Sequence, residues 1–132
     1  MVAQDVIDCD VHAVVPSVEA LFPYLDEHWR EYVSQSGFKG PTDTAYPKAP
    51  TSARPGTEPS GGGRLAGSDL DLLRAQTLDA WGAEVGILNC AYAVESIHNP
   101  DAEVALASAV NDWLLAEWLA HEPRLRAALV VP

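Results

Sequence analysis

The stretch SDLDLLRAQTLDAWGAEVGILNC, residues 68–90, decides the fold because it joins a helical pattern directly to a strand pattern. Ser68 is a typical helix N-cap, and the acidic residues that follow it suit the positive end of the helix dipole. Gly82 is expected to end the helix, and the apolar run 85–90 predicts a buried strand. The inner stripe of the helix is expected to consist of Leu70, Leu73, Thr77, Ala80 and Trp81.

A second helix and strand follow in the same order. Asn99 is expected to cap the helix, Pro100 suits its first position, and Pro123 marks its end. The apolar run 127–131 predicts a third strand. The inner face of this helix is expected to consist of Val104, Ala107, Val110, Leu114 and Trp118.

The sequence before residue 68 contains a strand, a helical region and a long insertion. Residues 6–12 are rich in β-branched residues and predict a strand, and residues 17–33 have helical spacing that Pro23 should break into two short helices. Residues 34–67 hold seven of the nine glycines and five of the ten prolines. With few large apolar groups to bury, this segment predicts a long mobile loop, disordered at 61–63.

Strands that alternate with helices of this length predict parallel βαβ units and an α/β fold. We expect one domain over residues 1–132, with 34–67 as its insertion. About three parallel strands neither close a barrel nor make a generous open sheet, and the sequence stops directly after the third. The pattern therefore predicts the N-terminal part of a larger fold.

Composition excludes several classes of function. The formal net charge of −11, from 19 acids and 8 bases, disfavours binding to nucleic acid or anionic lipid. There is no signal-peptide pattern and no apolar run of the ~18 residues that cross a bilayer. The two cysteines, Cys9 and Cys90, lie in apolar stretches and are expected to be buried free thiols. We expect a cytoplasmic protein with a small-molecule substrate, with homo-oligomerisation as an open alternative.

The first strand carries the chemistry-bearing residues. Asp8, Asp10 and His12 alternate along it, so they are expected to share one face, and Asp10 and His12 lie near its carboxyl end. A carboxylate and an imidazole at this spacing can bind one divalent cation. The alternative is a structural hydrogen-bonded pair at the end of a strand. Asp8 is more suited to support these ligands, while Asn89 and His98 are candidates for site polarity or substrate contact.

The sequence Ile7-Asp8-Cys9-Asp10-Val11-His12 resembles the opening strand of the amidohydrolase superfamily, in the branch related to aminocarboxymuconate semialdehyde decarboxylase. That branch reads Ile-Asp-x-His-x-His, and both histidines bind the metal. Asp10 stands at the first histidine position and His12 at the second. Parts of the run 69–132 are also similar to this branch.

The resemblance implies the N-terminal part of a TIM-type (β/α)8 barrel with one divalent metal ion, zinc first and manganese as the other candidate. It implies a metal-dependent hydrolase in which a complete member adds further ligands from later strands. Related decarboxylases of aromatic acids carry an acid at the first position, so a nonoxidative decarboxylase (a carboxy-lyase) of a small unsaturated or aromatic acid is the alternative. A third reading is a catalytically inert fragment or interaction module. No catalytic acid or base is assigned from the sequence.

Overall fold

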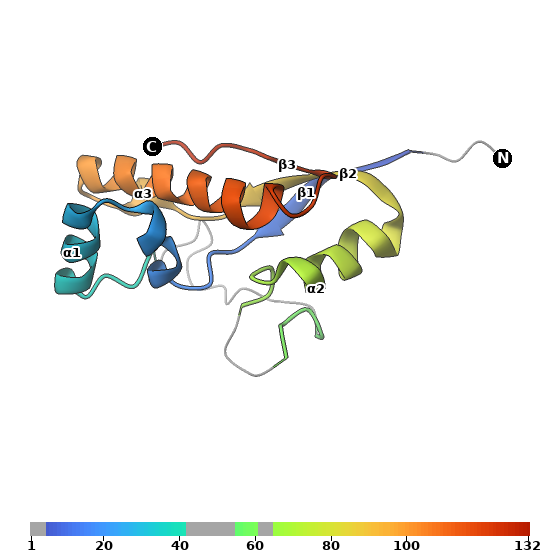
Figure 1. Cartoon of the computed structure of the whole chain (residues 1–132), viewed down its shortest axis with the longest axis horizontal. Helices are drawn as coiled ribbons and strands as arrows, with labels where there is room; N and C mark the ends of the chain where they lie inside the picture. Colours follow the sequence, from blue (N-terminus) through green and yellow to red (C-terminus); the bar gives the residue numbers. More distant parts are fainter. Residues whose placement is uncertain (1–4, 42–54, 61–64) are drawn as a thin grey trace.

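Three parallel strands form an open sheet in the computed structural model, which describes residues 5–41, 55–60 and 65–132. The strands β1 (Val6–Ala13), β2 (Ala83–Cys90) and β3 (Leu125–Ala127) lie side by side in chain order (Figure 1). The predicted α/β class with parallel βαβ units is therefore confirmed. An open sheet of this topology is compatible with part of a TIM-type barrel.

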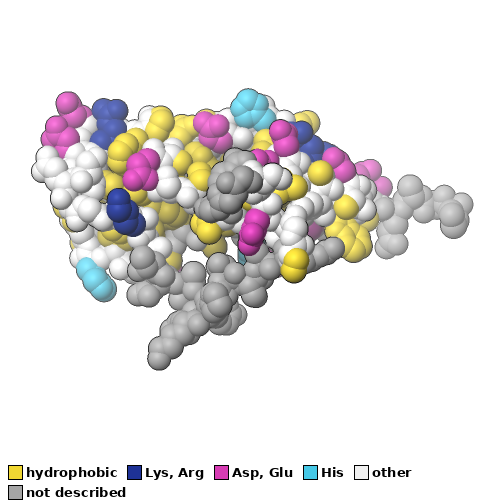
Figure 2. All heavy atoms as spheres, turned by 90° about the horizontal axis from the view of Figure 1, so that it is seen from below, with side chains coloured by type: hydrophobic (Ala, Val, Ile, Leu, Met, Phe, Trp, Pro, Cys, Tyr) yellow, Lys and Arg dark blue, Asp and Glu magenta, His cyan; other side chains and the backbone are white. Residues whose placement is uncertain are grey.

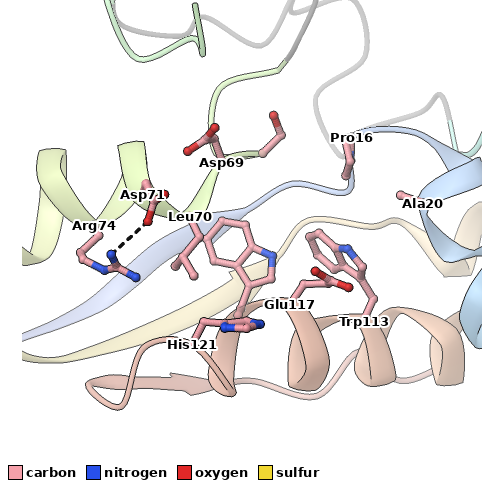
Figure 3. A pocket seen from close by; sticks show the side chains of 11 residues that line it. Pro16, Ala20, Asp69, Leu70, Asp71, Arg74, Trp113, Glu117 and His121 are labelled. Carbon is pink, nitrogen blue, oxygen red and sulfur yellow. Dashed lines mark hydrogen bonds and ion pairs between the residues drawn. The ribbon is translucent and has the colours of Figure 1, made fainter.

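Helices cover one face of this sheet. Crossover connections between parallel strands are right-handed. The crossovers from β1 to β2 and from β2 to β3 both move one strand in the same direction across the sheet, so their helices lie on the same face. A hollow on this face is lined by residues of α2 and of the end of α3, which lie opposite each other in Figure 3. The crossover elements are α2 (Leu70–Arg74), η2 (Ala75–Asp79), η3 (Val94–Ser96), α3 (Pro100–Leu114) and η4 (Leu115–Leu119).

Pairing between β1 and β2 is irregular at two places. Between Val6 and Ile7, one step along β1 matches two along β2, and between Asp8 and Val11 three steps match two. The strict alternation expected for residues 6–12 is therefore interrupted. Val11 is buried, whereas Ile7 is 58% exposed and Cys9 is exposed. The prediction of a buried thiol at Cys9 was wrong, because the extra residue in β1 breaks the two-residue period.

Each crossover helix contains a π-helical turn, and the turn in the first helix shifts the predicted inner stripe, whereas Ala107, Val110, Leu114 and Trp118 of the second helix are buried as predicted. Ala75–Asp79 and Leu115–Leu119 are wound with one extra residue per turn. In the first helix the buried leucines are consequently Leu73 and Leu78, five residues apart, and Trp81 is 70% exposed. In the second helix Trp113 and Trp118 are buried at the same spacing. The predictions that Ala80, Trp81 and Val104 face the core were wrong.

The caps explain where the helices begin. Asp69, and not Ser68 as predicted, caps α2, since its Oδ1 accepts from the Leu72 amide at 3.0 Å. Ser68 instead donates its hydroxyl to the Leu65 carbonyl at 2.6 Å and stabilises the preceding turn. Asn99 caps α3 as predicted, with Pro100 in the first turn.

The helical region after β1 is divided into two short helices, as predicted, but the break lies at Leu25 and Asp26, and Pro23 lies inside the first helix. It consists of the 3-10 helix η1 (Val18–Tyr24) and of α1 (Glu27–Ser36), which ends at Gly37 in the left-handed conformation. The helix thus extends three residues into the predicted insertion. Within that insertion, residues 55–60 and 65–67 are described and form specific contacts, while the prediction for 61–63 lies outside the described residues.

The third strand begins earlier than predicted and pairs over three residues only. Leu129 and Val131 are 75% and 66% exposed, so the run 127–131 is not a buried strand. The segment runs back along α3 in Figure 1, where the Asn111 side chain donates to the Val130 carbonyl at 2.8 Å and accepts from its amide at 2.9 Å.

Acidic side chains are spread over the face shown in Figure 2 and do not gather into a single patch. This distribution agrees with a net charge that acts over the whole surface. Within the described part of the chain, no helix is both long and apolar enough to cross a membrane.

Candidate functional site

Asp10 and His12 meet at the carboxyl-terminal half of β1. The Asp10 Oδ1 lies 3.0 Å from the His12 Nε2, within hydrogen-bonding distance. The two side chains therefore point to the same place, as the alternation in the sequence predicted. Both are accessible to solvent, with exposed fractions of 82% for Asp10 and 58% for His12. The enclosed, inward-facing environment expected for them is thus not formed by the described residues.

These two residues line a small hollow of about 180 Å³ between β1 and α2. Its walls come from four separate parts of the chain: β1, the insertion, the turn before α2, and the α2–η2 helix. Among the described residues, the charged groups on its lining are Asp8, Asp10 and Asp69, and no described lysine or arginine belongs to it. Three carboxylates and one imidazole favour a cation over an anion in this part of the hollow.

Hydrogen bonds to the β1 backbone fix the position of Asp10 and His12. Asp8, which is half-buried, accepts from the Asp10 amide through its Oδ1 at 3.1 Å. Asn89 lies opposite His12 in the register of β2 and donates from Nδ2 to the Cys9 carbonyl at 3.0 Å. Both residues thus fix the backbone on which Asp10 and His12 stand. These contacts agree with the supporting role expected for Asp8 and place Asn89 next to the pair.

The structure does not bring His98 to this hollow. His98 is exposed in the segment between η3 and α3, and it is absent from the lining of the Asp10–His12 hollow. Cys90 is also unsuited to metal binding or nucleophilic chemistry, because burial raises the pKa of its thiol to about 12. Asp10 and His12 therefore remain the central pair among the predicted residues.

Eight of the eleven residues that line the hollow were not predicted as site residues, Asp69, Thr57, Gly67 and Gln76 among them. Thr57 belongs to the insertion, Gly67 to its return and Gln76 to η2. Gln76 donates from Nε2 to the Gly56 carbonyl at 2.7 Å and so holds the insertion against the helix. No local pattern could have identified these residues, because they reach the hollow from distant parts of the sequence. The glycine at 67 was the one available signal, since glycine often marks a close backbone approach.

A larger hollow lies elsewhere, between α2 and the end of α3, with a volume of about 740 Å³ (Figure 3). Its charged groups already have partners: Asp71 pairs with Arg74, and Glu117 accepts from the Tyr24 hydroxyl at 2.6 Å. This hydrogen bond to Glu117 raises the pKa of Tyr24 to about 12. The hollow is larger than the one at Asp10 and His12, but its polar groups serve to join the helices.

The donor set at β1 fits part of a metal site. A carboxylate oxygen and an imidazole nitrogen that converge are typical ligands of zinc, and of manganese with more oxygen donors. Over the described residues, no cluster of three or more His, Cys, Asp or Glu side chains is arranged to hold an ion. Asp10 and His12 therefore offer two donors, fewer than the three or four protein ligands that a zinc site uses.

No protein-family model matches the sequence, and no curated protein matches it.

Proposed function

We propose that this chain contributes the first two metal ligands, Asp10 and His12, to a metal-dependent hydrolase of the amidohydrolase type. The observation that carries the proposal is the convergence of Asp10 Oδ1 and His12 Nε2, 3.0 Å apart, near the carboxyl end of the first parallel strand. Catalytic groups of parallel barrels gather at that end of the strands. The fold proposed for the complete protein is accordingly a TIM-type (β/α)8 barrel, of which this sheet forms the first three strands.

Each residue of the site has a distinct task in this proposal. Asp10 and His12 hold one divalent cation, zinc or manganese, and Asp8 fixes the Asp10 backbone through the 3.1 Å hydrogen bond. When bound, such a cation polarises a substrate carbonyl and lowers the pKa of a bound water toward ~7. The substrate is a small organic molecule with a carbonyl group, such as a lactone or an amide.

A nonoxidative decarboxylase is the second candidate, and the acid at position 10 favours it. The amidohydrolase branch that the β1 motif resembles has a histidine there, whereas its decarboxylases of aromatic acids accept an acidic residue. The described part of the wall has no lysine or arginine and so offers a substrate carboxylate no cationic side chain, and the metal would have to hold that carboxylate. Incubation of the complete protein and zinc or manganese with lactones, amides and aromatic acids distinguishes the two, because only the decarboxylase releases carbon dioxide.

The metal ligands can be tested separately from turnover. Zinc added to the chain should perturb the NMR signals of the His12 imidazole, and His12→Ala and Asp10→Ala should each abolish the uptake of zinc measured by elemental analysis. We expect the affinity of the chain to be weak, since two ligands do not complete a zinc site. His98→Ala, which changes an exposed histidine outside the hollow, is the matched control and should bind zinc as the wild type does.

Zinc that leaves His12 unaffected would contradict the proposal. With no turnover of any substrate class in addition, the chain would instead be an inert fragment or an interaction module. In that case the free edge of β1 offers hydrogen-bonding groups to another strand, and association through it should appear as a concentration-dependent mass in sedimentation.

A further inference from the structure

Gly67 joins the return of the insertion to the strand that carries the metal-ligand pair. The Val14 amide, directly after β1, donates to the Gly67 carbonyl at 2.9 Å. Gly67 also lines the same hollow as Asp10 and His12. The residue is therefore in contact with the proposed site, although it offers no side chain to it.

The structure leaves no room for a side chain at this position. A Cβ on Gly67 would lie 2.6 Å from the His12 carbonyl oxygen and 3.3 Å from the Val14 Cγ2. A gap of 2.6 Å is closer than carbon and oxygen atoms approach without a bond. The obstacle is the backbone of His12, which cannot rotate away as a flexible side chain would. Gly67 also has a φ of +78°, a conformation that other residues adopt only at a cost.

We propose that Gly67 is a positioning residue for His12: its bare α-carbon lets the insertion pack on the His12 backbone and so sets where the imidazole meets Asp10. This proposal rests on the metal-binding function proposed above. The tolerance of such a site is small, since metal–ligand distances vary by only about 0.2 Å. A methyl group at Gly67 would have to move the His12 backbone by more than that.

Two other glycines serve as controls that distinguish the effect of backbone strain from the effect of the contact with His12. Gly37 and Gly82 have φ values of +69° and +61°, close to that of Gly67, but a Cβ at either would meet nothing within 4 Å. Replacement of any of the three by alanine therefore introduces a similar strain of the left-handed conformation. Only the replacement at Gly67 also displaces His12.

The experiment compares zinc binding by the wild type, Gly67→Ala, Gly37→Ala and Gly82→Ala, with circular dichroism to establish that each is folded. Binding is followed by NMR at the His12 imidazole, with His28, His98 and His121 as internal references because all three are exposed outside the hollow. We expect Gly67→Ala to bind zinc at least about tenfold more weakly, the range found when residues that support metal ligands are changed. The other two variants should bind within about twofold of the wild type.

The outcomes separate the two proposals. Wild-type binding at His12 that persists unchanged in a folded Gly67→Ala chain overturns the role of Gly67 alone, and so does an equal loss in all three variants. Absence of wild-type binding at His12 overturns the metal-binding function, and the role of Gly67 with it.

If the Gly67→Ala chain does not fold, Ser68→Ala tests the proposal instead. This change weakens the turn at Gly67, because it removes the 2.6 Å hydrogen bond from the Ser68 hydroxyl to the Leu65 carbonyl and leaves the 3.2 Å bond from the Ser68 amide to the same carbonyl. Zinc binding weaker than that of the wild type, with an unchanged circular dichroism spectrum, supports the proposal. Unchanged zinc affinity overturns it.

Discussion

Trp118→Ala should lower the free energy of unfolding by about 3–5 kcal/mol, the usual loss when a buried aromatic side chain is truncated. Trp118 is 2% exposed and belongs to the core that joins the helices to the sheet. Its ring also packs edge-on against Trp113, with centroids 5.8 Å apart. Truncation therefore removes apolar burial and an aromatic pair together. Urea unfolding followed by circular dichroism measures the loss.

Trp81→Ala is the matched control for this prediction. Trp81 is the same residue type at the end of the other crossover helix, yet it is 70% exposed. Its truncation should change stability by about 0.5 kcal/mol or less. Equal losses in the two variants would show that the indoles are buried to the same degree, contrary to the π-helical phase described here.

Glu122→Gln should lower the free energy of unfolding at pH 7 by about 2–3 kcal/mol, because it removes charge-assisted hydrogen bonds from a buried carboxylate. Glu122 is 5% exposed and accepts from Arg74 Nε at 2.9 Å and from Arg124 Nη2 at 2.8 Å. Arg124 in turn donates to Asp79 at 2.9 Å. The carboxylate thus joins α2 and η2 to the turn that precedes β3.

This contribution depends on pH in a defined direction. The hydrogen bonds from Arg124, followed by those from Arg74, hold the pKa of Glu122 at about 2, below its ordinary 4.5. A depressed carboxyl pKa stabilises the folded state above the unfolded value and loses that effect as pH falls toward the folded value. The difference in stability between wild type and Glu122→Gln should therefore be full above pH 4.5 and shrink between pH 4.5 and 2.

Asp71→Asn provides the control, since Asp71 pairs with the same arginine, Arg74, at 3.0 Å but has an 88% exposed side chain. An exposed pair of this kind contributes at most about 1 kcal/mol. Urea unfolding of the three proteins at pH 7, 4.5 and 3 gives the comparison. A difference for Glu122→Gln that stays constant across this range would refute the assignment of its pKa.

The sequence allowed the order of strands and helices to be predicted because each element has its own periodicity and cap. The predictions that were wrong concern details that depend on hydrogen bonding within a helix or between two strands. A π-helical turn at Ala75–Asp79 leaves no residue signature, so the exposure of Trp81 was not predictable from a 3.6-residue period. The shift of register between Asp8 and Val11 likewise depends on the partner strand, which lies some seventy residues away in sequence.

For the candidate site, too, the sequence predicted what is local and did not predict the tertiary contacts. The proximity of Asp10 and His12 follows from two positions on one strand, which is local information. The solvent exposure of the pair, and the hollow that it shares with Thr57, Gly67 and Gln76, depend on how the insertion returns. Such tertiary contacts cannot be read from the spacing of residues along a chain.

The anchoring of the insertion at both ends has a consequence for how this protein can evolve. Gly37 ends α1 at one end, and the hydrogen bond between Val14 and Gly67 fixes the other. The entropy of closing a loop grows only with the logarithm of its length, by ~0.6 kcal/mol per doubling. Descendants can therefore lengthen, shorten or rewrite the stretch between these anchors, and acquire new chemical preferences, while the strands beneath keep their inherited arrangement.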